Sequence, residues 1–425
     1  MKVHSNFAIY LDRSPAESLS KELLLDLNFR GLISDSGINK VSFCGLIMAD
    51  GCINVFLPRA SDYQHLSEKE QISIAATTIR AVEKYGKEKN TRVDFKDELD
   101  GSFGLSHLSL IRKLLDDFRL YGIYSRRKVI KKINSSRPDW KRTIAKSSFF
   151  QGVGGAPIYL DIHSTQKRYF TDNEVSSIHA KVIGLLDKDF SWIISGRVGL
   201  IAPELNDYPS PVSNAHHQIY ILKKELHQTY AERDIKLLKD LINYLENYSG
   251  RQLSNFTAGV RDFHFVWEHM LRQVLENKVE LNNQLPAPAY IDIEGKVITA
   301  NQRSMRTDII LEDVSTSIVA VVDAKYYAAT SPENAPSWPD LVKQFFYAKA
   351  LKLIRPQSSV RNYFIFPNKN RYLVQARLRD RFYNHDQFYD DEFAPVDCIY
   401  VCPLEVLRNY TAGKKMKALT TQLLG

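Results

Sequence analysis

Two acids and a lysine stand at the ends of two consecutive apolar runs. Asp308 precedes the apolar residues of RTDIILED, and Asp323 and Lys325 follow those of SIVAVVDAKYY. Side chains two positions apart on a strand point to the same face, so Asp323 and Lys325 can meet one chemical group. If the two runs pair as strands, Asp308 comes near Asp323. Two neighbouring carboxylates repel each other unless a cation lies between them.

The chemistry that suits this set is hydrolysis of a phosphodiester with a hard divalent cation. Mg²⁺ or Mn²⁺ is bound by carboxylate oxygens, and waters and substrate phosphates complete its shell. Such an ion activates water and neutralises charge on the scissile phosphate. Lys325 would orient or deprotonate the water and stabilise the pentacovalent phosphorus. The alternative is a buried Asp–Lys ion pair that only ends a strand, because a short D-x-K pattern also matches by chance.

The segments on either side carry further polar candidates. Residues 256–280 have apolar residues at helical spacing, which predicts a long amphipathic helix that carries Glu268. The segment KQFFYAKAL carries Gln344 and Tyr347, which are three positions apart and therefore on one face of a helix. Structural alternatives exist for each of them: a solvated helix residue for Glu268, an exposed polar group for Gln344 and a core aromatic for Tyr347.

The order of elements predicts the fold of the C-terminal part, residues 251–425. It reads as a helix, a hairpin around Glu294-Gly295, two further strands, a helix, a strand, and a last strand and helix. This order indicates an α/β unit with a mixed central sheet.

Two other segments precede this part. Residues 1–150 are predicted to form an α+β DNA-binding region, in which residues 41–59 form two strands around a turn and residues 67–89 form a helix with a capping box. Residues 151–250 are predicted to be a mainly helical connection, with helices at 173–186 and 215–248. The Ser249-Gly250 break is the expected domain boundary.

Positive charge is concentrated in one window of the chain. Residues 112–146 contain twelve Lys and Arg but three Asp, a net charge of +9 that exceeds the +8 of the whole chain. Phosphate contacts from such residues give affinity for DNA without sequence information. A solvated basic face is the alternative. The residues predicted to contact DNA are Arg126, Arg127, Lys128, Lys131, Lys132, Lys141 and Arg142.

The totals exclude several classes of protein. A chain of 425 residues with 44% hydrophobic and 25% charged residues is expected to fold into two or three globular domains. Four scattered cysteines indicate neither a disulfide framework nor a zinc knuckle, and no P-loop pattern occurs. The charged N-terminal residues and the lack of a long apolar run predict a soluble, cytoplasmic protein without a membrane segment.

The set of motifs resembles the PD-(D/E)xK nuclease superfamily. In that superfamily a helix with a Glu precedes a strand with an Asp and a strand that ends in (D/E)-x-K, and the matching residues here are Glu268, Asp308, Asp323 and Lys325. The usual proline before the first aspartate is replaced by Thr307. Q-x-x-Y in the following helix is similar to an element of several branches. DAKYY, WEHML and RPDWKRTI are most similar to LlaJI-type restriction endonucleases and the related McrC subunits.

The resemblance implies a Mg²⁺-dependent endonuclease that cleaves double-stranded DNA in a restriction system. It implies that Asp308, Asp323 and Glu268 bind the metal, and that a separate AAA+ GTPase subunit like McrB assists. Two alternatives remain open from the residues. One is a non-catalytic DNA-binding scaffold with the same fold, and the other is a nuclease that acts on RNA or branched DNA.

Overall fold

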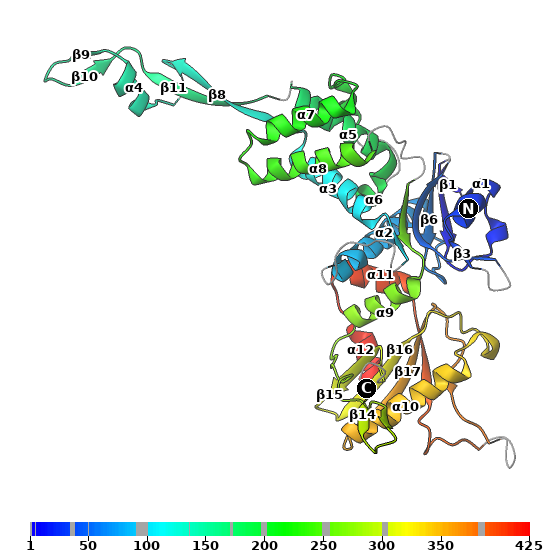
Figure 1. Ribbon diagram of the computed structural model, residues 1–425. Helices are drawn as coiled ribbons and strands as arrows, with labels where there is room; N and C mark the ends of the chain where they lie inside the picture. The colour runs from blue at the N-terminus through cyan, green and yellow to red at the C-terminus, as the bar shows by residue number, and fades with distance from the viewer. Residues whose placement is uncertain are drawn as a thin grey trace. The chain divides into compact units, whose positions relative to one another are not determined.

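The computed structural model describes residues 2–4, 6–34, 39–49, 51–90, 101–135, 137–170, 173–196, 202–248, 256–299, 305–380 and 387–425. The chain folds into two compact units (Figure 1). Unit 1 consists of Met1–Ser109, Ser195–Arg197 and Leu253–Gly425, and unit 2 consists of Leu110–Ile194 and Val198–Gln252. None of the described helices is both long and apolar enough to span a lipid bilayer.

Unit 1 contains a six-stranded mixed sheet, called here the N-terminal sheet. Its strands, in the order in which they pair, are β1 (Lys2–His4), β2 (Phe7–Leu11), β6 (Cys52–Leu57), β5 (Cys44–Ala49), β12 (Thr257–Val260) and β7 (Ser102–Phe103). The predicted strand pair around Gly51 is β5 and β6. Glycine allows β12 to join, because a Cβ at Gly259 would lie 2.4 Å from the Phe43 ring.

Helices flank the strands of unit 1. They are α1 (Lys21–Phe29), α2 (Glu68–Asn90), α9 (Phe263–Val274), α10 (Trp338–Ile354), α11 (Pro403–Ala412) and α12 (Lys417–Leu424). The predicted capping box of α2 is confirmed, since the Glu70 carboxylate accepts hydrogen bonds from the Ser67 N–H (2.9 Å) and hydroxyl (2.6 Å). α11 packs against both α2 and α9. A short strand pair, β3 (Ile33–Ser34) and β4 (Lys40–Val41), lies beside α1 in the chain.

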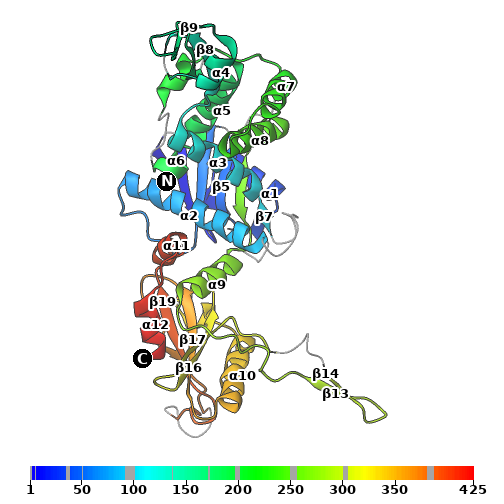
Figure 2. The same ribbon diagram turned by 90° about the vertical axis from the view of Figure 1, so that its left-hand side faces the viewer.

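A second mixed sheet, the C-terminal sheet, confirms the predicted α/β unit. Its strands, in pairing order, are β15 (Ile309–Asp313), β16 (Ile318–Ala324), β17 (Ser359–Pro367), β19 (Val396–Val401) and β18 (Gln375–Ala376). β16, β17 and β19 are parallel, and the two edge strands are antiparallel to their neighbours. α10 connects β16 to β17, and α10 and α12 cover opposite faces of the sheet (Figure 2).

The hairpin predicted around Gly295 is present. β13 (Ala289–Ile291) pairs with β14 (Val297–Thr299), and Gly295 has a φ of 81° in the turn. This hairpin projects from the C-terminal sheet (Figure 2).

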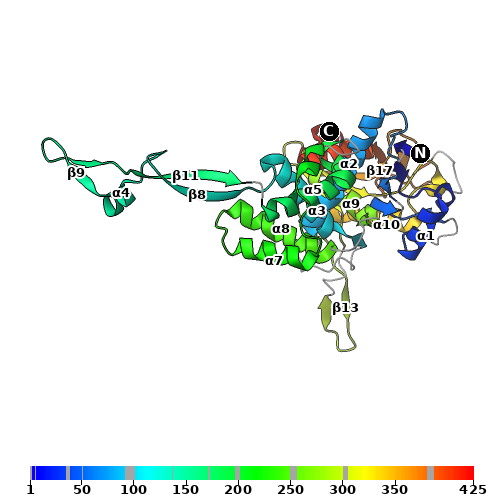
Figure 3. The same ribbon diagram turned by 90° about the horizontal axis from the view of Figure 1, so that it is seen from above.

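Unit 2 combines a helical body with a long ribbon. Its elements are the end of α3 (Leu105–Tyr121), β8 (Arg126–Ile133), α4 (Trp140–Lys146), β9 (Phe149–Gln151), β10 (Pro157–Tyr159), β11 (His163–Phe170), α5 (Glu174–Phe190), α6 (Trp192–Ser195), α7 (Ala215–Leu226) and α8 (Glu232–Tyr248). β8 and β11 pair along their whole length and, with α4, β9 and β10, extend away from the helices (Figures 1 and 3). Residues 126–170 are called the basic ribbon below.

Some expected elements are different in the structure. The single helix predicted over residues 256–280 is strand β12 followed by α9, because the β-branched and glycine residues before Asp262 pair with the N-terminal sheet. The helix predicted over 215–248 is two helices, α7 and α8. The basic segment after α3 is strand β8.

The compact units also run differently from the expected segments 1–150, 151–250 and 251–425. Unit 2 begins at Leu110, before the expected boundary at residue 150, and it ends near the expected boundary at residue 250. The first and last parts of the chain share one unit because β12, which comes after that second boundary, completes the N-terminal sheet.

Candidate active site

Asp308 and Asp323 lie together where two neighbouring strands meet. β15 and β16 are antiparallel with Ile309 opposite Val322, so Asp308, just before β15, lies opposite Asp323 near the end of β16. The Asp308 carboxylate accepts a hydrogen bond from the backbone N–H of Ala324 (3.0 Å) and is hydrogen-bonded to Asp323. The strand pairing on which the predicted acid pair depended is therefore present.

Thr307, which replaces the usual proline before Asp308, is held by Asn282. The Asn282 side-chain oxygen accepts hydrogen bonds from the Thr307 N–H (3.0 Å) and hydroxyl (2.9 Å), and its amide donates to the Thr307 carbonyl (3.2 Å). Thr307 is buried. Three hydrogen bonds to one side chain thus hold the backbone before Asp308, where a proline ring would limit it by its own covalent geometry.

The two carboxyl groups hold a proton more tightly than ordinary aspartates. Burial, and then the negative charge of Asp308, raise the pKa of Asp323 to about 7. Burial and the charge of Glu268 also raise the pKa of Asp308. Only 13% of the Asp323 side chain is exposed, so water screens the repulsion weakly. The pair therefore carries a proton near neutral pH unless a cation replaces it.

Lys325 lies between two carboxylates. Its ammonium nitrogen is 3.0 Å from Asp323 and 2.8 Å from Asp340, which is in the first turn of α10. Burial alone would lower the pKa of Lys325, but the two acids outweigh it and raise that pKa. Lys325 therefore stays an ammonium group at neutral pH.

Asp340 was not predicted from the sequence. Burial would raise the pKa of its carboxyl group, but the hydrogen bond from Lys325 and the contacts with Ser337 outweigh it and hold that pKa below its usual range. Asp340 also accepts from the Ser337 N–H (3.1 Å) and hydroxyl (2.9 Å) at the helix start. The pattern S-x-x-D before an apolar run is the signal that could have placed this acid in the first turn.

Glu268 on α9 lies close enough to sense the acid pair. Burial and the charge of Asp323 raise the pKa of Glu268, while Arg272, Arg306 and Lys325 lower it. Its side chain is partly exposed, unlike its buried neighbour Trp267. Glu268 therefore lies within electrostatic reach of the acid pair.

Gln344 and Tyr347 occupy different places on α10. Gln344 is fully buried, and its amide donates to the backbone carbonyls of Tyr363 (3.1 Å) and Val321 (3.4 Å), which fastens α10 to β16 and β17. The Tyr347 hydroxyl donates to the carbonyl of Arg306 (2.8 Å). Burial and the charges of the two aspartates raise the pKa of Tyr347.

The two histidines around Glu268 do not join the acids. The His269 ring bonds to Glu88 of α2 (2.7 Å), and the His264 ring lies against Phe265, 4.0 Å between centroids. In the part of the chain that the structure describes, no three His, Cys, Asp or Glu side chains gather as a ready metal cage.

The residues predicted to contact DNA lie on the basic ribbon. Lys131 on β8 and Lys141 on α4 are exposed, and Lys132 and Arg142 are partly exposed. Arg126 is instead ion-paired with Glu225 (3.2 Å) at the root of the ribbon. The side chains of Arg127 and Lys128 lie outside the described residues.

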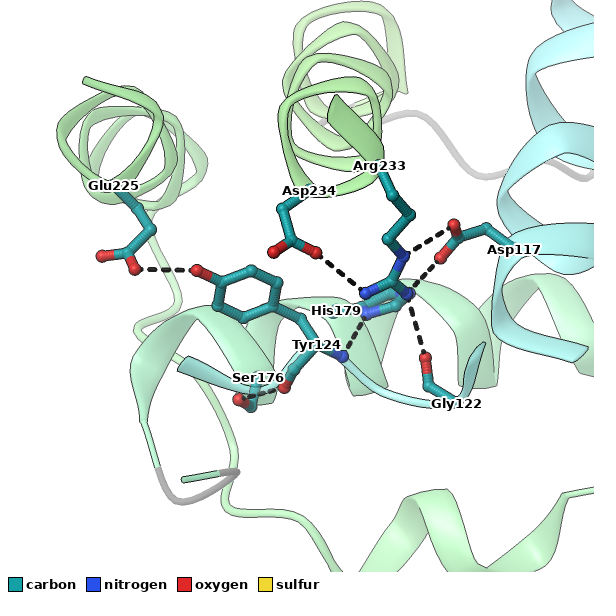
Figure 4. A network of polar contacts seen from close by, with 8 residues as sticks. All are labelled: Asp117, Gly122, Tyr124, Ser176, His179, Glu225, Arg233 and Asp234. Atoms are coloured by element: carbon teal, nitrogen blue, oxygen red, sulfur yellow. Dashed lines mark hydrogen bonds and ion pairs between the residues drawn. The ribbon is translucent and has the colours of Figure 1, made fainter. Parts of the chain in front are cut away.

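A polar network anchors the root of the ribbon to the helices (Figure 4). The Tyr124 N–H donates to His179 Nδ1 (3.0 Å), and its hydroxyl donates to Glu225 (2.8 Å). Burial lowers the pKa of His179 to about 3, so the ring is neutral and accepts at Nδ1. Arg233 binds Asp117 with two nitrogens (3.0 and 2.5 Å). These bonds determine how the chain leaves α3 and enters β8.

The far end of the ribbon, called here the tip, is apolar. Its hairpin β9–β10 exposes more than half of each of four large side chains, namely Phe149, Phe150, Val153 and Ile158. Exposed apolar patches of this kind are typical of surfaces that bind another macromolecule.

Comparison with known proteins identifies the family of the chain. The family described as LlaJI restriction endonuclease matches residues 43–380, a range that contains the acid pair, Lys325 and the basic ribbon. The chain belongs to the LlaJI restriction endonuclease family. The predicted resemblance to this family is thereby confirmed.

This LlaJI family member also resembles individual proteins. It is 27% identical over 404 residues to the type II restriction enzyme BsuMI component YdjA of Bacillus subtilis (strain 168), which covers 91% of this chain and 84% of that protein. Among solved structures, it matches a chain in the half-complex of Thermococcus gammatolerans McrB AAA+ hexamers with bound McrC, with a TM-score of 0.37 and 13% identity, over 96% of this chain and 99% of that chain.

Proposed function

We propose that this chain is a Mg²⁺-dependent DNA endonuclease, the cleavage subunit of a restriction system, with a PD-(D/E)xK site at the edge of its C-terminal sheet. The observation that carries the proposal is the buried Asp308–Asp323 pair, which has a raised pKa and lies beside the ammonium group of Lys325. Membership of a restriction endonuclease family supports DNA as the substrate. Asp308, Asp323 and Lys325 at the ends of paired strands support the superfamily.

The residues fit a hard divalent cation, which would be Mg²⁺ or Mn²⁺. Two buried carboxylates that repel each other favour binding of a cation between them, and Mg²⁺ is commonly held by one or two carboxylates with waters and phosphate oxygens. Asp308 and Asp323 would hold the ion, with Glu268 as a third acid nearby. When bound, the ion supplies an activated water and neutralises charge on the phosphate.

The other residues of the site act through charge and position. Lys325 stays protonated, and its ammonium group would donate hydrogen bonds to the attacking water and the phosphate oxygens. Asp340 holds this ammonium group in place through an ion pair. Glu268, whose pKa is raised, can accept a proton from a water that approaches the pair. Gln344 holds α10 against the sheet, so the helix start that carries Asp340 stays next to Lys325.

DNA would be held by the lysines and arginines of the basic ribbon. An antiparallel two-stranded ribbon fits the major groove of double-stranded DNA, and Lys131, Lys132, Lys141 and Arg142 would neutralise phosphates along it. Arg126 has a different part, because its ion pair with Glu225 uses its charge within the protein.

A protein partner, an AAA+ GTPase subunit like McrB, is proposed from the resemblance of the sequence. The exposed aromatic and aliphatic side chains of the tip support a protein contact, because the buried core of a protein interface is apolar and rich in aromatic side chains. The charged residues of the ribbon would then bind DNA, and the apolar tip would bind the protein partner.

Cleavage and binding assays with single variants test the proposal. Asp323→Ala and Lys325→Ala are expected to abolish cutting of plasmid DNA with Mg²⁺ while DNA affinity, measured without divalent cation, stays close to that of the wild type. Asp313→Ala is the matched control, since this partly exposed carboxylate lies at the other end of β15 and accepts hydrogen bonds from the Ser315 N–H and hydroxyl in its own turn. The assay uses methylated and unmethylated plasmid, with and without the GTPase subunit and GTP.

Two results would contradict the proposal. Wild-type rates in both variants would show that the chemistry takes place elsewhere. Mg²⁺ binding that is the same in wild type and Asp308→Asn, with no cutting by the wild type under any of these conditions, would instead favour the non-catalytic scaffold.

A further inference from the structure

Tyr326, the residue after Lys325, connects the two sheets of unit 1. Its side chain is buried, and its hydroxyl accepts a hydrogen bond from the backbone N–H of Arg59 (2.7 Å). The Arg59 guanidinium donates to the Tyr326 carbonyl (3.1 Å) and lies 5.8 Å from the centre of the ring. Arg59 follows β6 of the N-terminal sheet, so both ends of Tyr326 are attached to that sheet.

The attachment includes a buried acid. Asp12, just after β2, is almost fully buried, and the Tyr326 hydroxyl, Arg13 and Arg59 all stabilise its charge. β2 and β6 are parallel with Leu11 opposite Leu57, so Asp12 and Arg59 leave the sheet at the same edge. One end of the N-terminal sheet therefore provides a carboxyl group, from Asp12, and a guanidinium group, from Arg59, that both interact with Tyr326.

The other side of the Tyr326 ring contacts the helix that carries Glu268. Its ring centroid lies 5.4 Å from that of Phe263 and 6.4 Å from that of Trp267, and both are buried residues of α9. Trp267 immediately precedes Glu268 in the sequence. Tyr326 thus touches α9 directly and is covalently joined to Lys325.

We infer that Tyr326 is a positioning residue, which uses Arg59 and Asp12 of the N-terminal sheet to hold Lys325 and helix α9 in the arrangement that cleavage requires. The inference rests on the proposed function. A backbone that can neither rotate nor slide at residue 326 leaves Lys325 little freedom between its two carboxylates, and small misplacements of such groups reduce rates strongly. Arg59 and Asp12, at one edge of the N-terminal sheet, then support the active site without touching the substrate.

The variant that tests the inference is Tyr326→Phe, which keeps the ring contacts and removes the hydroxyl. Tyr63→Phe is the matched control, because Tyr63 is also a buried tyrosine of unit 1 and its hydroxyl donates to the Ile9 carbonyl (3.1 Å) of the same sheet. A second variant, Arg59→Lys, keeps the positive charge but cannot donate through a guanidinium.

Single-turnover cleavage with Mg²⁺ is expected to slow by about ten- to a hundredfold in Tyr326→Phe, with DNA affinity and melting temperature close to those of Tyr63→Phe. Tyr63→Phe is expected to cleave at the wild-type rate, and Arg59→Lys is expected to be intermediate. Wild-type cleavage by Tyr326→Phe, or equal slowing in both tyrosine variants, would overturn the inference.

A readout that needs no nuclease activity separates this inference from the proposed function. The rate at which an acetylating ester modifies Lys325 in the intact full-length protein can be followed by mass spectrometry. We expect modification about tenfold faster in Tyr326→Phe and unchanged in Tyr63→Phe, because losing one hydrogen bond to a buried group makes local opening more frequent. If Lys325 reacts equally in both, Tyr326 does not position it, whether or not the wild type cuts DNA.

Discussion

The Asp308–Asp323 pair is predicted to release a proton when it binds a divalent cation. The pKa of Asp323 is about 7, because burial and the charge of Asp308 both favour the protonated form. Binding of Mg²⁺ requires charged carboxylates, so any proton on the pair must leave. Because this raised pKa lies near neutrality, binding is expected to release most of a proton per site near pH 6 and little near pH 8.

Isothermal titration calorimetry of Mg²⁺ in buffers of different ionisation enthalpy measures this proton release. No DNA is present, so turnover does not interfere. In Asp308→Asn the repulsion is removed and the pKa of Asp323 falls, so we expect both less proton release near pH 6 and weaker Mg²⁺ binding. Asp313→Asn removes an acid of the same strand, where hydrogen bonds from Ser315 and Thr316 lower the pKa, and should change neither quantity.

Two results would refute this reasoning. One is proton release that does not fall between pH 6 and pH 8. The other is the same release in Asp323→Asn as in the wild type, which would mean that the proton comes from a different group.

Three further changes test other parts of the structure. Asp340→Asn removes one of the two acids on Lys325 and should slow single-turnover cleavage by about tenfold, while plasmid binding is unchanged. Asn282→Ala removes three hydrogen bonds from Thr307 and should lower the unfolding free energy by about 1–3 kcal/mol, as measured by urea denaturation, and weaken Mg²⁺ binding. Lys131→Gln with Lys132→Gln should reduce the salt dependence of DNA affinity by about two phosphate contacts, and an unchanged slope in a filter-binding assay would contradict the ribbon as the DNA site.

The sequence predicted the C-terminal sheet because its pattern is local. A continuous apolar run predicts a central strand covered on both faces, which is β16, and the segment that follows it was predicted as a helix between two strands, which is α10. Asp323 and Lys325 are two positions apart on that strand, so their common face follows from strand geometry alone. For the same reason, the position of Asp308 beside Asp323 required only the pairing of two adjacent strands.

Long-range pairing explains the elements that sequence reasoning missed. The residues of β12 were assigned to a helix because Phe263, Trp267 and Met270 recur at helical spacing, and the predicted helix was extended to the residues before them. The segment instead pairs with β5, more than 200 residues earlier, where the fit depends on Gly45 and Gly259. A local period cannot reveal a partner strand so distant in the chain.

The basic ribbon shows a related limit. The charge of residues 112–146 predicts affinity for phosphate equally well in a loop, a helix or a strand. Its strand form depends on β11, whose residues lie beyond the charged window and pair with β8 in a continuous register. The charge count also could not separate Arg126, which pairs with Glu225, from Lys131, which faces solvent.

The acid pair gives the metal-free protein a stability that depends on pH. The pKa of Asp323 rises from 3.8 to about 7 on folding, so its contribution is fully present below pH 3.8 and is lost as the pH rises through 7. The full shift corresponds to a loss of about 4 kcal/mol. Asn282, Gln344 and the Lys325–Asp340 pair make hydrogen bonds in the strands and helix that carry the acid pair, and these bonds do not involve its proton. The pair can thus stay poised for a cation at neutral pH without unfolding the sheet that holds it.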